Sequence, residues 1–191
     1  MKIEDLRGFL RKAAWYLTLS GATVYSRQAI RWCIANLGGR EFHNFQQLGA
    51  ILAYASLNDV GAFWLNDRLL TVNKKKKSYW TRDVVQVFGH DWIDLVEAFP
   101  VIFDDDSIET ALKSHSKNQK LFSTLNLVNF RAAGAITLPI MKANRTYLKR
   151  TSSRGLTPFW LVLLFPRKLA ILLKKAVKAA FGLISTKSRW N

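Results

Sequence analysis

Residues 159–184 read FWLVLLF-P-RKLAILLKKAVKAAFGLI. The first seven residues are apolar, Pro166 interrupts the chain, and an amphipathic helix pattern follows. At about 100° per residue, the cations of this pattern fall within roughly a third of the helix circumference. Those cations are Arg167, Lys168, Lys174, Lys175 and Lys178. The stretch predicts a basic amphipathic helix at the C-terminal end of a mainly α-helical protein.

A narrow cationic stripe beside a broad apolar face is typical of a helix that lies in a membrane interface. We therefore expect Trp160, Phe165 and Phe181 to insert into lipid while the cations contact the headgroups. Two alternatives stay open. The helix can pack in the protein core with its lysines extending to water, or it can bind a groove on a partner protein.

Negative charge ends at Glu109. Residues 110–191 contain 16 lysines and arginines and no acid, whereas residues 1–109 contain 13 residues of each sign. The whole formal charge of +16 therefore belongs to the C-terminal part of the chain. Uncompensated charge of one sign indicates an anionic partner, either a membrane surface or a nucleic acid.

Lys149, Arg150 and Arg154 directly precede the apolar run. A basic segment next to an apolar anchor supplies the two signals that stable peripheral attachment needs. The polar residues 151–155 end in glycine and are the best linker candidate. We therefore divide the chain into a compact helical body, residues 1–150, and a basic membrane-interaction element, residues 151–191.

Length and composition favour a folded peripheral protein. The chain has 191 residues, of which 49% are hydrophobic, enough for a sizeable core. No stretch reaches the roughly 18 to 20 uncharged apolar residues of a spanning helix. Cys33 is the only cysteine, which excludes an internal disulfide and favours a reducing, cytoplasmic location. Oligomerisation is left open.

Apolar spacing and helix-capping residues predict the helices of the body. The second of them should bury a stripe of Ile30, Cys33, Ile34 and Leu37. Strands are an alternative at 84–88 and 101–103, which would give a small β element near 71–103. The predicted helices cover residues 3–17, 26–37, 42–55, 58–70, 91–98, 104–117, 119–132 and 140–150.

Asp104, Asp105 and Asp106 form the densest acidic cluster. Adjacent carboxylates are suited to Mg²⁺ or Mn²⁺, and such a site would fit a membrane-associated, metal-dependent transferase. The simpler interpretation places these acids at a helix N-terminus, where the helix dipole favours them. A metal enzyme would need a second acidic motif, and no acid follows Glu109. We therefore favour a protein that is not an enzyme.

A second basic segment supports the nucleic-acid alternative. Lysines beside aromatic residues can contact phosphates while the rings stack on bases. The lysines otherwise form a solvated loop. The residues concerned are Lys74, Lys75, Lys76, Lys77, Tyr79, Trp80 and Arg82.

The histidines and the cysteine give weaker signals. His90 and Asp91 form a pair found in helical metal phosphohydrolases, but no acid lies downstream to complete such a site. We expect Asp91 to cap the helix that starts at Trp92. We also expect His115 on the surface and Cys33 in the core.

Overall fold

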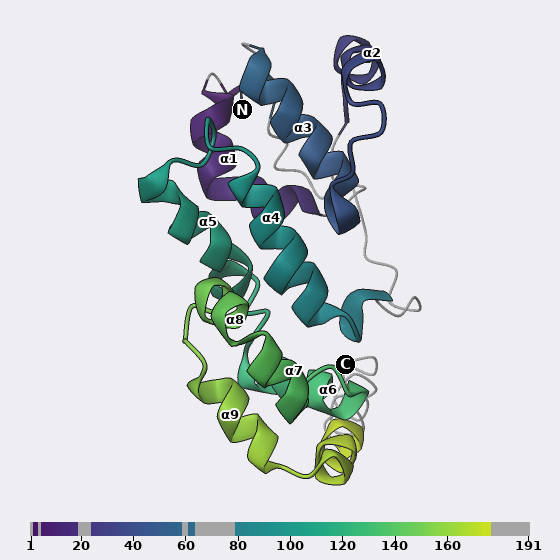
Figure 1. Ribbon diagram of the computed structural model, residues 1–191, viewed down its shortest axis with the longest axis vertical. Coiled ribbons are helices and arrows are strands. Elements are labelled where there is room, and N and C mark those ends of the chain that lie inside the picture. The colour runs from purple at the N-terminus through teal and green to yellow at the C-terminus, as the bar shows by residue number, and fades with distance from the viewer. Residues whose placement is uncertain (1, 4, 19–23, 59–60, 64–78, 177–191) are drawn as a thin grey trace, which may run out of the picture.

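The chain is mainly helical, as the sequence predicts, with one small antiparallel sheet (Figure 1). The computed structural model describes residues 2–3, 5–18, 24–58, 61–63 and 79–176. The α-helices in chain order are α1 (Leu6–Ala13), α2 (Arg27–Asn36), α3 (Gln46–Leu57), α4 (Trp92–Glu97), α5 (Asp105–Asn118), α6 (Thr124–Ala133), α7 (Leu138–Ala143), α8 (Arg145–Thr151) and α9 (Thr157–Leu164). Residues 167–176 are also helical. Shorter helical segments are η1 (Ala14–Thr18), η2 (His43–Phe45), η3 (Tyr79–Thr81) and the π-helix η4 (Gln86–Asp91).

Capping side chains set where several helices begin. Ser26 accepts a hydrogen bond from the backbone N–H of Ala29 at 3.1 Å and starts α2. Ser123 does the same for α6, so the helix predicted from residue 119 begins at Thr124 instead. The backbone before this cap has already turned, because Lys120 has a positive φ of 52°. Local hydrogen bonding therefore outweighs the apolar spacing at this helix start.

The sheet joins the N-terminus to a segment that was predicted to be helical. Strand β1 (Lys2–Ile3) pairs antiparallel with β2 (Ala62–Phe63). The predicted helix over residues 58–70 is therefore wrong at β2, and most of its other residues lie outside the described ranges. The predicted first helix likewise begins at Leu6 rather than at Ile3, because Ile3 is in β1.

The β element expected near residues 71–103 is not a strand in the described part, residues 79–103. Residues 84–91 are helical and continue as a π-helix into α4. Residues 101–103 form a turn, in which the N–H groups of Ile102 and Phe103 donate to the carbonyl of Phe99. Turn hydrogen bonds thus satisfy backbone groups that a strand would have paired with a neighbour.

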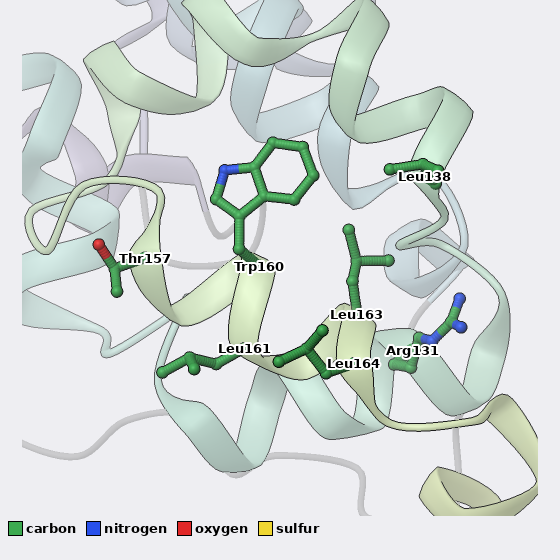
Figure 2. A pocket seen from close by; sticks show the side chains of 7 residues that line it. All are labelled: Arg131, Leu138, Thr157, Trp160, Leu161, Leu163 and Leu164. Atoms are coloured by element: carbon green, nitrogen blue, oxygen red, sulfur yellow. The ribbon is translucent and has the colours of Figure 1, made fainter.

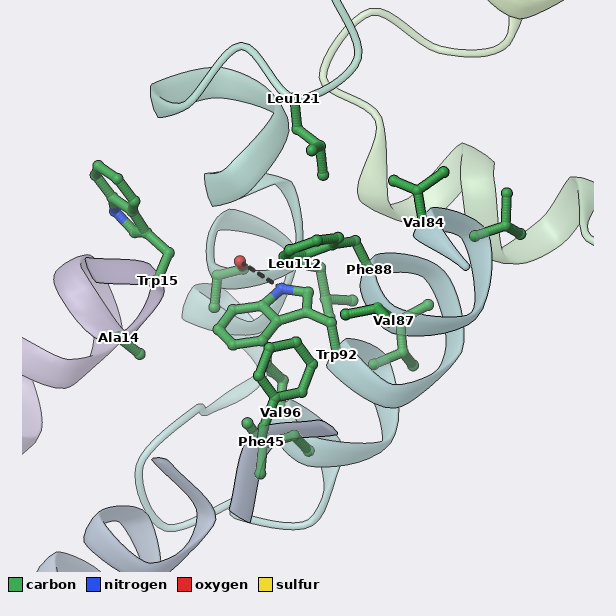
Figure 3. Close-up of a cluster of buried hydrophobic side chains, with 14 of the residues drawn as sticks. Ala14, Trp15, Phe45, Val84, Val87, Phe88, Trp92, Val96, Leu112 and Leu121 are labelled. Atoms are coloured by element: carbon green, nitrogen blue, oxygen red, sulfur yellow. Dashed lines mark hydrogen bonds between the residues drawn. The ribbon is translucent and has the colours of Figure 1, made fainter. Parts of the chain in front are cut away.

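Trp92 lies at the centre of the hydrophobic core (Figure 3). Its indole Nε1 donates to the carbonyl of Ala111 at 3.2 Å, and its ring meets Phe45 edge to face at 5.5 Å. The same continuous core extends from Leu10 of α1 to Val162 of α9. Consequently α9 is part of this core, although the sequence places it in a separate element.

The elements lie along one long axis (Figure 1). Helices α1, α2 and α3 are at one end, and α9 with the helix of residues 167–176 is at the other. The predicted helix over 140–150 is divided at Asn144 into α7 and α8. Residues 151–155, the predicted linker, are held against α5, because the N–H of Ser153 donates to Ser116 Oγ at 2.7 Å. The two-part division of the chain stays a prediction.

Candidate functional site

Helix α9 has one buried face and one exposed face. Phe159 and Val162 point into the core, where Phe159 lies 5.0 Å from the ring of Phe122. Trp160 and Leu161 are exposed to 36% and 56%. Two such side chains alone are ordinary on a protein surface, so their meaning depends on the exposed apolar residues around them.

The turn at Phe165 and Pro166 ends α9 and redirects the chain. Phe165 has an extended backbone (ψ 126°), as the following proline requires. Its carbonyl accepts a hydrogen bond from Arg131 Nε at 3.3 Å. Beyond the turn, residues 167–176 form a helix that is anchored through Ala170, which is 1% exposed.

Arg167 has a structural role in this anchoring. Its Nε donates to the carbonyl of Ala132 at 3.3 Å, at the C-terminal end of α6. A Cβ atom on Gly134 would lie only 3.2 Å from Arg167 Nη2, so the guanidinium rests directly on the α6 terminus. A cation at a helix C-terminus is favourable because the last carbonyl groups carry partial negative charge.

Exposed apolar side chains recur along α9, the turn after it and the next helix. We call this set the apolar ridge. Its members are Trp160, Leu161, Leu164, Phe165, Leu169, Leu172 and Leu173. Leu164 is the most exposed, at 79%. Exposed apolar side chains mark an interaction site where they join into a large patch.

Lysines accompany the apolar ridge. Lys168, Lys174 and Lys175 are exposed, and within the described ranges none of them forms an ion pair with an acid. Lys178 and Phe181 lie outside the described residues. The core-helix alternative is therefore not what residues 167–176 adopt, because their leucines face water together with the lysines.

The three cations before α9 differ in whether an acid compensates their charge. Lys149 and Arg154 are exposed, whereas Arg150 bridges Glu97 at 2.7 Å and Glu109 at 3.6 Å. The hydrogen bond and charge of Lys113, together with Arg150, lower the pKa of Glu109. Arg150 is thus neutralised within the fold, and the free positive charge belongs to the two neighbouring cations.

A groove lies between α9 and α7 (Figure 2). Its volume is about 470 Å³. The walls are almost entirely apolar, with Arg131 at one end and Thr157 at the other. The lining residues are Arg131, Leu138, Thr157, Trp160, Leu161, Leu163 and Leu164. Arg131 and Leu138 have no distinguishing sequence pattern, so only packing reveals their place in this groove.

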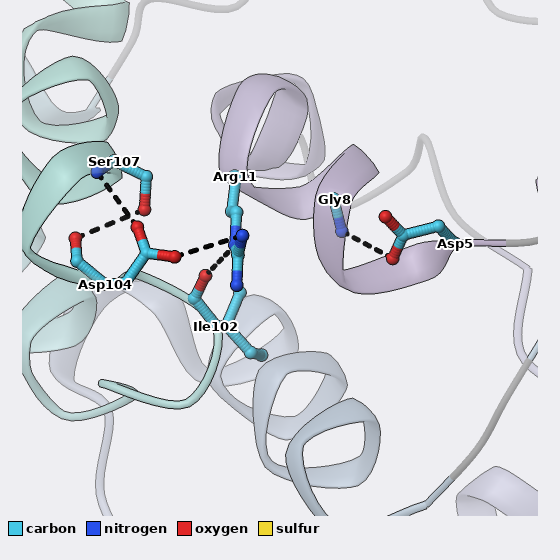
Figure 4. Close-up of polar contacts among 6 residues, drawn as sticks. All are labelled: Asp5, Gly8, Arg11, Ile102, Asp104 and Ser107. Carbon is cyan, nitrogen blue, oxygen red and sulfur yellow. Dashed lines mark hydrogen bonds and ion pairs between the residues drawn. The ribbon is translucent and has the colours of Figure 1, made fainter.

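The acidic cluster starts helix α5 (Figure 4). Asp104 accepts a hydrogen bond from the N–H of Ser107 at 3.0 Å and pairs with Arg11 at 3.0 Å. The bond from Ser107, with a contribution from the Arg11 charge, lowers the pKa of Asp104. Asp105 and Asp106 occupy the first turn, where the helix dipole favours acids.

This arrangement agrees with the helix-start interpretation of the cluster. In the part of the chain that the structure describes, no group of three or more His, Cys, Asp or Glu side chains is placed to hold a metal ion. The Mg²⁺ or Mn²⁺ alternative, and the transferase built on it, therefore gain no support from these residues.

The other titratable residues belong to the core or its edge. His115 is buried between Phe88 and Trp92, so its predicted surface position is wrong, and burial lowers its pKa to about 3. Asp91 does not cap α4 with its side chain. Instead it accepts hydrogen bonds from Asn44 at 2.5 Å and Gln86 at 2.7 Å.

Cys33 is half-buried rather than fully in the core. Burial raises the pKa of its thiol, whose Sγ lies 3.8 Å from the carbonyl of Ala50. His90 stacks on Tyr147 with ring centroids 3.8 Å apart and hydrogen bonds to Asn144. These contacts account for both side chains without a catalytic role.

The predicted nucleic-acid segment is only partly described. Lys74, Lys75, Lys76 and Lys77 lie outside the described residues. Trp80 is half-buried and packs edge to face on Phe88 at 5.1 Å, and Arg82 is exposed. A ring committed to the core in this way has less surface for stacking on a base.

Comparisons with protein-family models, curated proteins and solved structures find no match to this chain. No helix among the described residues combines the length and apolar character needed to cross a bilayer. The candidate site is therefore interpreted from its own geometry, and the apolar ridge with its lysines is the feature that most needs a partner.

Proposed function

We propose that the protein is a peripheral membrane protein that attaches to an anionic bilayer through the apolar ridge and its neighbouring lysines. The supporting observation is the exposure of these leucines and aromatic rings beside Lys168, Lys174 and Lys175. Lipid would cover the apolar side chains, while anionic headgroups would compensate charge that no acid after Glu109 can balance.

The expected free energies of lipid contact favour stable attachment to a bilayer. Full burial of one leucine contributes about 1.5–3 kcal/mol, and the ridge offers several such side chains. Each lysine near an anionic leaflet adds about 1 kcal/mol. Helix α9 has eight residues and is about 12 Å long, far short of a bilayer core of about 30 Å, so it would lie in the interface.

A nucleic-acid partner explains the charge but not the apolar ridge. Phosphate contacts use lysines and arginines and are weakened by salt, yet they would leave the exposed leucines in water. A peripheral membrane role uses both features at once. A cytoplasmic location, in which the lone Cys33 stays reduced, belongs to the same proposal.

Vesicle flotation tests the proposal with the full chain. We expect flotation with vesicles containing phosphatidylglycerol and little flotation with pure phosphatidylcholine. Leu164→Ser combined with Leu172→Ser should weaken binding at least tenfold, because about 1.4 kcal/mol corresponds to a factor of ten. Leu125→Ser is the control, since Leu125 is a half-exposed leucine on α6 outside the ridge.

Two further measurements complete the test. Replacing Lys168, Lys174 and Lys175 with glutamine should remove the preference for anionic vesicles and leave the helical circular dichroism unchanged. A salt-sensitive shift of nucleic acid without any flotation would overturn the membrane proposal in favour of nucleic-acid binding.

A further inference from the structure

We infer that the groove between α9 and α7 binds one acyl chain of an anionic lipid, with the charged end of the lipid beside Arg131. This inference rests on the proposed function for the class of ligand. It adds a specific site for one lipid molecule to a surface that otherwise contacts the bilayer without selecting a particular lipid. Three observations support it: the uncompensated charge of Arg131, the apolar composition of the groove walls and the position of the polar groups at the two ends of the groove.

Arg131 is held at the groove by neutral partners. Its Nε donates to the carbonyl of Phe165 at 3.3 Å, and its Nη1 donates to the carbonyl of Ile136 at 3.0 Å. These carbonyls position the guanidinium but leave its positive charge uncompensated. The described residues that follow Glu109 include no acid, and no acid of the described ranges pairs with Arg131. A fixed, unpaired guanidinium favours an anionic group with oxygen acceptors.

The walls beyond Arg131 are suited to hydrocarbon. Trp160 and Leu163 of α9 lie on the side toward Leu138 of α7, and Leu161 and Leu164 also line the groove (Figure 2). Leu138 is 49% exposed, and filling the groove would cover part of that surface. The volume of about 470 Å³ is within the range of small-molecule sites.

The polar groups are placed at the ends of the groove. Arg131 is at one end, and the hydroxyl group of Thr157 is at the other, with apolar side chains between them (Figure 2). A free phosphate would use only the Arg131 end and leave the apolar walls in water. A nucleobase would find few hydrogen-bonding partners along the walls. An amphiphile with one anionic end and an apolar chain matches both parts.

Monomeric amphiphiles with the same chain test this inference. Decyl phosphate, decanol and decyltrimethylammonium would each be titrated, below micelle formation, into the full chain in a calorimeter. We expect decyl phosphate to bind, the cationic amphiphile to bind at least tenfold more weakly, and inorganic phosphate alone not to bind. Equal binding of the three amphiphiles, or no binding of decyl phosphate, would overturn the inference.

Leu138→Ser and Leu125→Ser form a matched pair. Both leucines lie in the first turn of a helix, and their exposures are 49% and 50%, but only Leu138 lines the groove. Leu138→Ser should weaken decyl phosphate binding about tenfold, and Leu125→Ser should leave it unchanged. Arg131→Gln should bring the affinity for decyl phosphate down to that for decanol. Equal effects of the two serine variants would place the amphiphile elsewhere and refute the site.

Flotation of the same variants separates the two proposals. Leu138 is outside the apolar ridge, so Leu138→Ser should still float with anionic vesicles. If the wild-type chain floats but decyl phosphate does not bind, the groove inference is wrong and the proposed function stands. If the wild-type chain does not float, the proposed function is wrong, whatever binds in the groove.

Discussion

His115 is a titratable residue in an apolar site. Its ring lies 4.8 Å from that of Phe88 and 4.5 Å from that of Trp92, and its Nδ1 has no hydrogen-bond partner among the described residues. Protonation would place an uncompensated charge in the core, which explains why its pKa falls to about 3. Folding therefore requires the neutral imidazole.

This burial predicts a specific dependence of stability on pH. The folded-state pKa is below the unfolded value of about 6.5, so the unfolded chain binds the extra proton and stability falls as pH decreases through that range. We expect the free energy of unfolding to decrease by about 1–2 kcal/mol between pH 7 and pH 5. Urea denaturation of the wild type and His115→Leu should show this decrease only in the wild type. Parallel pH profiles would exclude His115 as the cause.

Asp104 illustrates a residue whose role follows from its immediate neighbours. Its carboxylate satisfies the N–H of Ser107 and pairs with Arg11, while Arg11 Nε also donates to the carbonyl of Ile102 at 2.6 Å (Figure 4). The start of α5 and the last part of α1 are therefore connected through a single side chain.

Substitution at Asp104 should act on stability and not on metal binding. Asp104→Ala removes the capping acceptor, and we expect the thermal midpoint to fall by roughly 2–4 °C. The thermal midpoint of Asp104→Asn should fall less, because an amide oxygen can still accept a hydrogen bond from the N–H of Ser107. Asp105→Ala serves as the comparison. A rise in the midpoint of the wild type on adding Mg²⁺ or Mn²⁺ that Asp104→Ala abolishes would contradict the capping role.

At the scale of elements, the end of α6 positions the helix of residues 167–176. Gly134 ends α6 with a left-handed φ of 87°. The next helix then rests on that end through Arg167 and through Ala170. A glycine at this position serves two purposes: it permits the left-handed turn and leaves space for the guanidinium.

Gly134→Ala should be costlier than the same change at Gly155. Both glycines have a positive φ, 87° and 65°, so alanine at either is expected to cost about 1–2 kcal/mol. Only at Gly134 would the new Cβ approach Arg167, at 3.2 Å, whereas nothing lies within 4 Å of a Cβ at Gly155. Denaturant unfolding of the two variants measures the difference. Equal losses would show that the Arg167 contact contributes nothing measurable.

At the scale of the molecule, α9 connects the predicted membrane element to the core of the body. Phe159 is fully buried, lies 5.0 Å from Phe122 and belongs to the same apolar cluster as Trp92. A helix with one face in the core and the other in water can present the apolar ridge rigidly. The ridge would then meet a bilayer without first unfolding from the protein.

Phe159→Ala tests whether the two parts unfold together. Removing this ring should lower the free energy of unfolding by about 3–5 kcal/mol in a single cooperative transition. If residues 1–150 form an independent domain, their main transition would instead keep its midpoint. Circular dichroism and tryptophan fluorescence measured on the same urea series distinguish the two results. Phe165→Ala is the control, because that ring is exposed.

Spacing and capping residues predicted much of the local structure. Ser26 starts α2, the acids at 104–106 start α5, and a helix follows Pro166 as expected, although the helix before it, α9, was predicted only as an apolar run. These features depend on hydrogen bonds and backbone angles within a few residues, so the local sequence contains the required information. The uneven distribution of charge is also a property of the chain alone.

Which side chains are buried depends on which helices pack together, and the apolar spacing along the sequence predicted this poorly. The predicted core stripe of α2 is wrong at Ile30 and Ile34, which are exposed, Ile34 to 75%. Leu37 does pack against the core, and Trp32, outside the stripe, packs against Tyr54 of α3. His115 is buried, and the groove brings Arg131 together with Leu138 and α9. An apolar pattern says that a face can be buried, but the partner that covers it comes from distant parts of the chain. Only the packed structure therefore shows which leucines remain in water and are free to bind.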